Sequence, residues 1–142
     1  MLPSVLALGP MPTIRFDVLC PPPAAAEIGL AFQRALDILV KRGRLVSGSA
    51  RSEGIALVDA PVAAQLASTY EQDRGSDPDE DGAQVHRFSI EAEGASSYNS
   101  LAMGLSRILT PKADLPRDPV LLEQQDRFEE AAIYPWTVEV LR

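Results

Sequence analysis

An amphipathic helix predicted over residues 22–43 constrains the fold more than any other part of this chain. Its apolar side chains recur at intervals of four, three and four residues and so share one stripe of the helix: Ile28, Phe32, Ala35 and Leu39. Two prolines suit its first turn, and Gly43 suits the position that ends it. Leu30 and Ile38 lie towards the polar side, which is typical of isolated exposed apolar residues, of a second covering layer or of a partner contact. Because one face of the helix must be buried, the rest of the chain has to provide a layer that covers it.

Three other segments alternate apolar and polar residues at the two-residue period of a half-buried strand. They are residues 13–20, 85–92 and 134–141. In the first of them, Ile14 and Phe16 face one way and Arg15 faces the other. Strands of this kind form a sheet with helices packed on one face.

The remaining segments complete the order of elements. We expect short strands at 44–50 and 54–59 joined by a turn around 52–54, and helices at 61–72, 96–109 and 119–131. The order β-α-β-β-α-β-α-α-β predicts an α+β fold, with a mainly antiparallel sheet and helices packed on one face. The best-matching topology is a ferredoxin-like split β-α-β core, with the helices at 61–72 and 119–131 as additions. This fold hosts many functions, so it does not assign one by itself.

The sequence predicts a single α+β domain over residues 13–142, preceded by a flexible leader at 1–12. The leader lacks the basic start, long apolar stretch and cleavage site of a signal peptide. Translation from Met1 and translation from Met11 both leave the predicted domain intact. No apolar run approaches the roughly 20 residues that a membrane helix needs.

The charge of the chain limits its partners. The net charge is −7, and Lys and Arg are not clustered, so phosphate backbones and anionic membranes are disfavoured as partners. A basic protein partner is compatible with this charge. The single cysteine, Cys20, excludes an intrachain disulfide and a cysteine zinc cluster, and a cytoplasmic location is the default. Because the common nucleotide, metal and hydrolase motifs are absent, we expect no cofactor.

The acidic loop at 73–84 contains the most specific local motif. Acidic residues occupy positions 1, 3 and 5 of a calcium-loop pattern, and glycine occupies position 6: Asp77, Asp79, Asp81 and Gly82. The pattern then fails, because Phe88 stands where the bidentate glutamate belongs and a strand follows where a helix is needed. The alternative is a solvated acidic loop, in which Glu80 joins these carboxylates as a surface for a basic partner.

Cys20 and His86 form a second candidate site. Cys20 lies where a strand leads into a helix, a position at which a thiol can become nucleophilic. If strands 13–20 and 85–92 pair antiparallel, the end of the first lies near the start of the second, and His86 approaches Cys20. The alternative is a buried, inert cysteine.

The third candidate is the sheet face that no helix covers. Its polar residues come from three strands: Arg15, Asp17, Arg87, Ser89, Glu91, Thr137 and Glu139. As a functional site they would form a platform for a partner or a small ligand. As structure they are the wet side of an amphipathic sheet, held by cross-strand ion pairs.

Two functional hypotheses remain from different classes. The first is a non-enzymatic acidic protein-binding module, such as an immunity or inhibitor-type protein or an assembly adaptor, which binds through the acidic loop and the open sheet face. The second is a small α+β ligand-binding protein or enzyme that uses the open sheet face or the Cys20 and His86 region. Homodimerisation through the sheet or an edge strand stays open.

Overall fold

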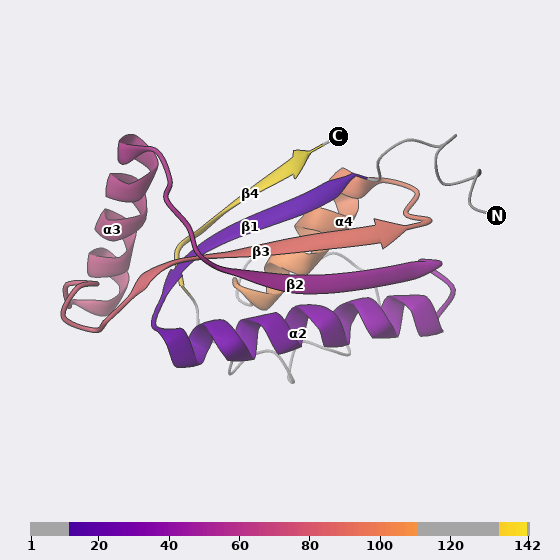
Figure 1. Ribbon diagram of the computed structural model, residues 1–142, viewed down its shortest axis with the longest axis horizontal. Coiled ribbons are helices and arrows are strands. Elements are labelled where there is room, and N and C mark those ends of the chain that lie inside the picture. The colour runs from indigo at the N-terminus through magenta and orange to yellow at the C-terminus, as the bar shows by residue number, and fades with distance from the viewer. Residues whose placement is uncertain (1–11, 111–133, 142) are drawn as a thin grey trace.

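The computed structural model describes residues 12–110 and 134–141 of the chain. In chain order the elements are β1 (Thr13–Cys20), α2 (Pro22–Lys41), β2 (Ser47–Ile55), α3 (Ala60–Arg74), β3 (Gln84–Glu93), α4 (Tyr98–Leu105), the 3-10 turn η1 (Ser106–Ile108) and β4 (Trp136–Leu141). The described strands form one open antiparallel sheet with the order β2-β3-β1-β4 (Figure 1). The fold class is therefore α+β.

The alternation in β1 places one set of its side chains in the main core. Ile14, Phe16 and Val18 are fully buried, and they face α2 and α4. The ring of Phe16 stacks on that of Phe32 of α2, with centroids 4.8 Å apart. The predicted apolar stripe of the helix thus packs on the predicted apolar face of the strand, and together they form the main core.

Helix α2 lies very close to the edge strand β2. A Cβ placed on Gly48 of β2 would lie 3.2 Å from side-chain atoms of Leu36, which is fully buried. Gly48 therefore permits the close approach of helix to strand, which is a common reason for glycine inside a strand. Leu30 of α2 is exposed and Ile38 is half-buried against the core.

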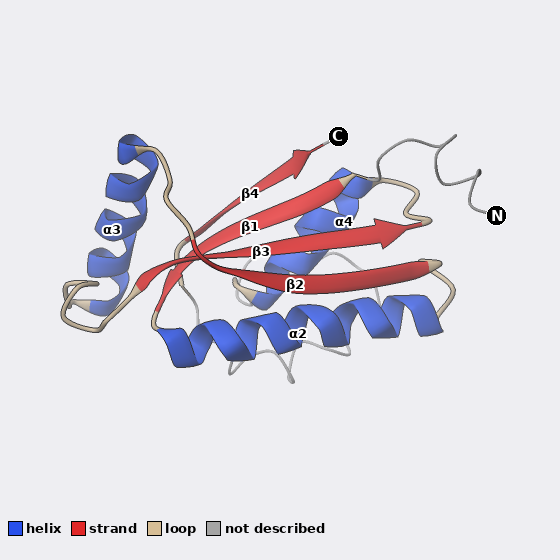
Figure 2. Ribbon diagram, in the orientation of Figure 1, coloured by secondary structure: helices blue, strands red, loops and turns tan. Residues whose placement is uncertain are grey.

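Helix α3 departs from the expectation that the helices share one face. Its Leu66 and Tyr70 pack on Leu19, whose side chain alternates away from those of Phe16 and Val18. Helices α2 and α4 cover the main core, whereas α3 covers one end of the opposite face (Figure 2). Alternation predicted a uniformly polar outer face, but the apolar Leu19 at the end of β1 gives α3 a place to pack.

The prediction of two short strands at 44–50 and 54–59 is wrong. One strand, β2, runs through the predicted turn and pairs with β3 along its whole length. The register shifts between Ser52 and Gly54, where Gly54 has a positive φ of 85°. A glycine in a strand is typical either of a turn that reverses the chain or of a β-bulge. Because β2 pairs with β3 on both sides of Gly54, this glycine lies at a bulge.

The predicted helix at 96–109 is a shorter α-helix followed by a 3-10 turn. Ser97 caps α4, because its hydroxyl accepts a hydrogen bond from the Ser100 backbone N–H at 3.1 Å. The predicted helix at 119–131 and the leader up to Met11 lie outside the described residues. No helix in the described part of the chain is long and apolar enough to cross a membrane.

Candidate functional site

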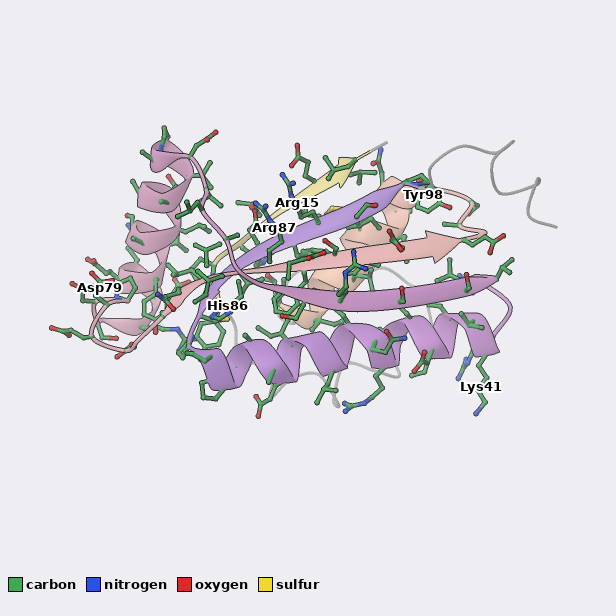
Figure 3. All side chains as sticks on the ribbon, in the orientation of Figure 1. Arg15, Lys41, Asp79, His86, Arg87 and Tyr98 are labelled. Atoms are coloured by element: carbon green, nitrogen blue, oxygen red, sulfur yellow. The ribbon has the colours of Figure 1, made fainter. Side chains whose placement is uncertain are left out.

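The polar residues of the open sheet face are bound mainly to one another. Arg87 donates two hydrogen bonds to the Asp17 carboxylate, at 2.9 and 3.1 Å, and Asp17 is buried. Arg15 of β1 donates to Glu139 of β4 at 2.6 Å. The hydrogen bond from Arg87 to Asp17 raises the pKa of Arg87. Figure 3 labels Arg15, which lies on β1, and Arg87, which lies opposite Asp17 on the neighbouring strand β3. Partners on adjacent strands therefore pair these charges, and only the buried Nε of Arg15 has no hydrogen-bond partner among the described residues of this face.

Glu53 is a member of this face that the sequence did not predict. Its carboxylate accepts hydrogen bonds from Ser89 and from Arg51, the latter at 3.1 Å, and both lower its pKa. It was missed because residues 52–54 were expected to form a turn and instead lie in β2. Glu91 also lies on this face, exposed and opposite Thr13 and Ser49.

Two carboxylates of the acidic loop, those of Asp77 and Asp81, have partners other than a cation. Asp81 accepts hydrogen bonds from the Tyr70 hydroxyl and from the Ser76 hydroxyl, each at 2.8 Å. The bond from Ser76, and then that from Tyr70, lowers the pKa of Asp81. Asp77 accepts the backbone N–H of Asp79 at 2.9 Å and so holds a local turn. Among the described residues no group of three metal-binding side chains could hold an ion, and the calcium hypothesis has no support.

The acidic loop and the open sheet face do not form one surface. Figure 3 places Asp79 beyond α3 at one end of the molecule, apart from Arg15 and Arg87. The residues predicted as partner-binding therefore fall into two separate groups.

Cys20 and His86 lie close together, but the thiol is not activated. Cys20 is fully buried, and burial raises the pKa of its thiol to about 12. His86 is 7% exposed, and burial lowers its pKa, opposed by a hydrogen bond to the Cys20 backbone. Its Nε2 has no partner in the described part of the chain. At neutral pH the pair is a protonated thiol and a neutral imidazole, which lacks the thiolate that a cysteine nucleophile needs.

A cleft that the sequence did not predict lies between α3 and the start of β4. Its volume is about 550 Å³, and its described lining residues come from α3, from the end of the α4 region and from β4: Pro61, Val62, Gln65, Leu66, Thr69, Asp73, Thr110, Tyr134, Pro135, Trp136 and Thr137. Asp73 is the one charged side chain in this described lining. No local motif could reveal this cleft, because the segments that form it are far apart in the sequence.

Two aromatic side chains form a fixed wall of the cleft. The indole N–H of Trp136 donates to the Thr110 hydroxyl at 2.7 Å. Tyr134 stacks on Tyr70, with ring centroids 6.1 Å apart, and the Arg74 guanidinium lies 3.9 Å from the Tyr134 ring centroid. These contacts hold both rings in place, so the wall is organised in advance of any binding.

Comparisons of this chain with protein-family models, with curated proteins and with solved structures found no match. A function for this chain therefore has to be inferred from its own geometry.

Proposed function

We propose that this protein is a non-enzymatic protein-binding module that receives a basic segment of its partner in the cleft between α3 and β4. One observation carries the proposal. The cleft has aromatic walls, and its described lining contains a single charge, the carboxylate of Asp73. An immunity or inhibitor-type protein and an assembly adaptor both fall within this proposal.

The size and lining of the cleft fit a side-chain anchor. Binding pockets commonly measure roughly 300–1,000 Å³ and combine apolar walls with a few polar groups. Here Val62, Leu66 and Trp136 supply apolar surface, and Thr69 and Gln65 supply hydrogen-bonding groups. Pre-positioned aromatic side chains are typical of the residues that contribute most to protein interfaces.

The charge of the site favours a lysine or arginine side chain. Its methylene stem would lie along the Trp136 ring, because the Arg74 guanidinium already lies over the Tyr134 ring, and its cationic head would reach Asp73. The net charge of the chain is −7, and the exposed Asp77, Asp79 and Glu80 follow α3 directly. This negative field would steer a basic partner towards the cleft. In this proposal the paired residues of the open sheet face stabilise the sheet.

The enzyme hypothesis receives less support from the chemistry of the site. Its nucleophile, Cys20, is buried with a pKa of about 12. A non-enzymatic role needs no activated group and uses only the shape and charge of the cleft.

We also propose that the sheet order β2-β3-β1-β4, with α2 and α4 on one face, represents a ferredoxin-like core. We further propose that the protein is cytoplasmic.

Selection from a phage-displayed library of random linear peptides tests the proposed function. We expect the selected peptides to be enriched in lysine and arginine, and their binding to weaken with rising salt. The Thr69→Trp substitution fills the cleft from α3 and should abolish binding of these peptides. Ser68→Trp is the matched control, because Ser68 is the exposed neighbour on the same helix and does not line the cleft.

Two outcomes would contradict the proposal. One is a selection against the wild-type protein that enriches no basic sequence. The other is a set of peptides that bind the Thr69→Trp and Ser68→Trp proteins equally well. The Asp73→Asn substitution distinguishes the contribution of charge to binding from that of shape. It keeps the volume of the cleft and removes the one charged side chain of the described lining.

A further inference from the structure

Within the part of the chain that the structure describes, the two edges of the sheet differ in whether their outward backbone groups have partners. At the β2 edge, the Gln33 side chain of α2 accepts the Ala50 backbone N–H at 2.8 Å and donates to the Gly48 carbonyl at 3.2 Å. One side-chain amide thus replaces the peptide group of a neighbouring strand. The bulge between Ser52 and Gly54 further interrupts this edge. These features are those that proteins use to prevent pairing at an edge.

The β4 edge carries backbone groups that have no partner among the described residues. The Leu19 N–H donates to the Pro135 carbonyl at 2.9 Å, which makes this a hydrogen-bonded pair of the ladder between β1 and β4. Such pairs alternate with non-hydrogen-bonded pairs in an antiparallel ladder. The N–H and C=O groups of Trp136, Val138 and Val140 therefore point outward. These outward N–H and C=O groups form no hydrogen bond with any described residue.

The side chains of β4 do not protect its edge. The strand has the sequence WTVEVL, which is rich in residues that favour strands, and contains neither a proline nor a bulge. Its one charged residue, Glu139, is bound to Arg15. An edge of this composition pairs readily with another extended chain.

The cleft adjoins the β4 edge, which is free as far as the structure describes the chain, because Trp136 belongs to both. A segment that paired with β4 and ran past Trp136 would pass directly over the cleft. Its side chains would alternate between the two faces of the sheet, so that one of them could enter the cleft.

From this arrangement we infer that the partner's basic segment binds as a fifth, antiparallel strand on the free edge of β4, with a lysine or arginine beyond Trp136 anchored at Asp73. This inference rests on the proposed function, because it describes how the same partner is held. An antiparallel partner continues the geometry of the sheet. The basic anchor would then lie on the C-terminal side of the paired residues.

N-methylation of the tightest-binding peptide from the library selection tests the inference on the wild-type protein. A methyl group removes one backbone donor and blocks close approach of a strand. We expect methylation at alternate positions of the paired residues to weaken binding by about tenfold or more, and methylation at the positions between them to have little effect. Hydrogen exchange at the Val138 and Val140 amides should slow on binding.

A variant of β4 gives an independent measurement. The outward N–H of Val138 is not used by the sheet, so Val138→Pro should fold and lose peptide binding. Val138→Ala is the control, because it keeps the N–H. If Val138→Pro does not fold, the methylated peptides still decide the question on the wild-type chain.

The outcomes distinguish this inference from the proposed function. Peptides that require an open cleft but tolerate methylation at every position would overturn strand addition and leave the proposed function intact. A selection that enriches no basic peptide would overturn both. Protection of the Val138 and Val140 amides in a homodimer without peptide would assign the edge to a second copy of the chain and overturn the inference.

Discussion

The side-chain amide of Gln33 accepts a hydrogen bond from the backbone N–H of Ala50 at 2.8 Å, and so ties α2 to the outer edge of β2. The same amide donates to Asp37 at 2.8 Å, which orients it along the helix. Gly48 allows the helix to lie close enough for these bonds to form. A residue on the polar side of the predicted helix thus closes one edge of the sheet.

Replacing Gln33 with Ala should destabilise the fold and expose the β2 edge. The loss of hydrogen bonds to partly buried backbone groups predicts a decrease of about 1–2 kcal/mol in the free energy of unfolding. Urea unfolding measures this decrease, and sedimentation should detect new self-association at high protein concentration. Arg34→Ala is the matched control, because Arg34 is the exposed neighbour on α2. Equal stability and equal mass for the two variants would show that Gln33 does not protect this edge.

The pair of Asp17 and Arg87 should show strong coupling. Replacing Arg87 with Ala leaves the buried Asp17 carboxylate without its guanidinium, and we expect a loss of about 2–3 kcal/mol in stability. The Asp17→Ala and Arg87→Ala double variant should lose less than the sum of the two single variants. Additive losses in a double-mutant cycle of urea unfolding would contradict the coupling.

The buried His86 should make stability fall as the pH is lowered. Burial depresses the pKa of His86 in the folded state below its ordinary value of 6.5. The unfolded chain therefore takes up a proton that the folded chain resists, and stability is lost as the pH falls below about 6.5. Urea unfolding at pH 7.5 and at pH 5.5 measures this loss.

The His86→Gln variant is the control for the pH prediction. A neutral amide keeps hydrogen-bonding capacity at this position and cannot take up the proton. We expect its stability to change less between the two pH values than that of the wild type. The pKa values of Glu53 and Asp81 are lowered, so these groups affect stability at a more acidic pH. They contribute little to the change in stability between pH 5.5 and pH 7.5. An unchanged slope in His86→Gln would assign the effect to other groups.

The Cys20 thiol should resist alkylation in the folded protein. Its pKa of about 12 leaves almost no thiolate at neutral pH, and its side chain is fully buried. We expect no modification by iodoacetamide at pH 7.5 in native buffer and complete modification in denaturant. Mass spectrometry reads both results. Rapid modification of the native protein would revive the hypothesis of a cysteine nucleophile.

The regular elements could be predicted because their patterns are local. The stripe of Ile28, Phe32 and Leu39 shows the period of a helix, and the alternation in Ile14 and Phe16 shows that of a strand. Both periodicities follow from backbone geometry and need no knowledge of neighbours. The boundary of β2 was missed because the residues around Gly54 suit a turn and a bulge equally, and only pairing with β3 decides between them.

The candidate sites could likewise be predicted where they depend on neighbouring residues, and not where they depend on contacts between distant segments. The sequence correctly placed Arg15, Asp17, Arg87 and Glu139 on one face, because alternation fixes the side of a strand from which each residue projects. It did not indicate that Asp81 would bind Tyr70 and Ser76, since that contact depends on how the loop packs under α3. The cleft was missed because it joins α3 to residues near the end of the chain.

By itself, the sequence determined the α+β class, the period and buried face of the main elements, and the acidic net charge of this protein. Only the tertiary structure decided that Gln33 closes the edge of β2, that the edge of β4 stays free within the described residues, and that a cleft opens beside Trp136. The physical reason is that periodicity and charge are properties of neighbouring residues. An edge or a cleft is defined by which distant segments pack together and which backbone groups they leave without a partner.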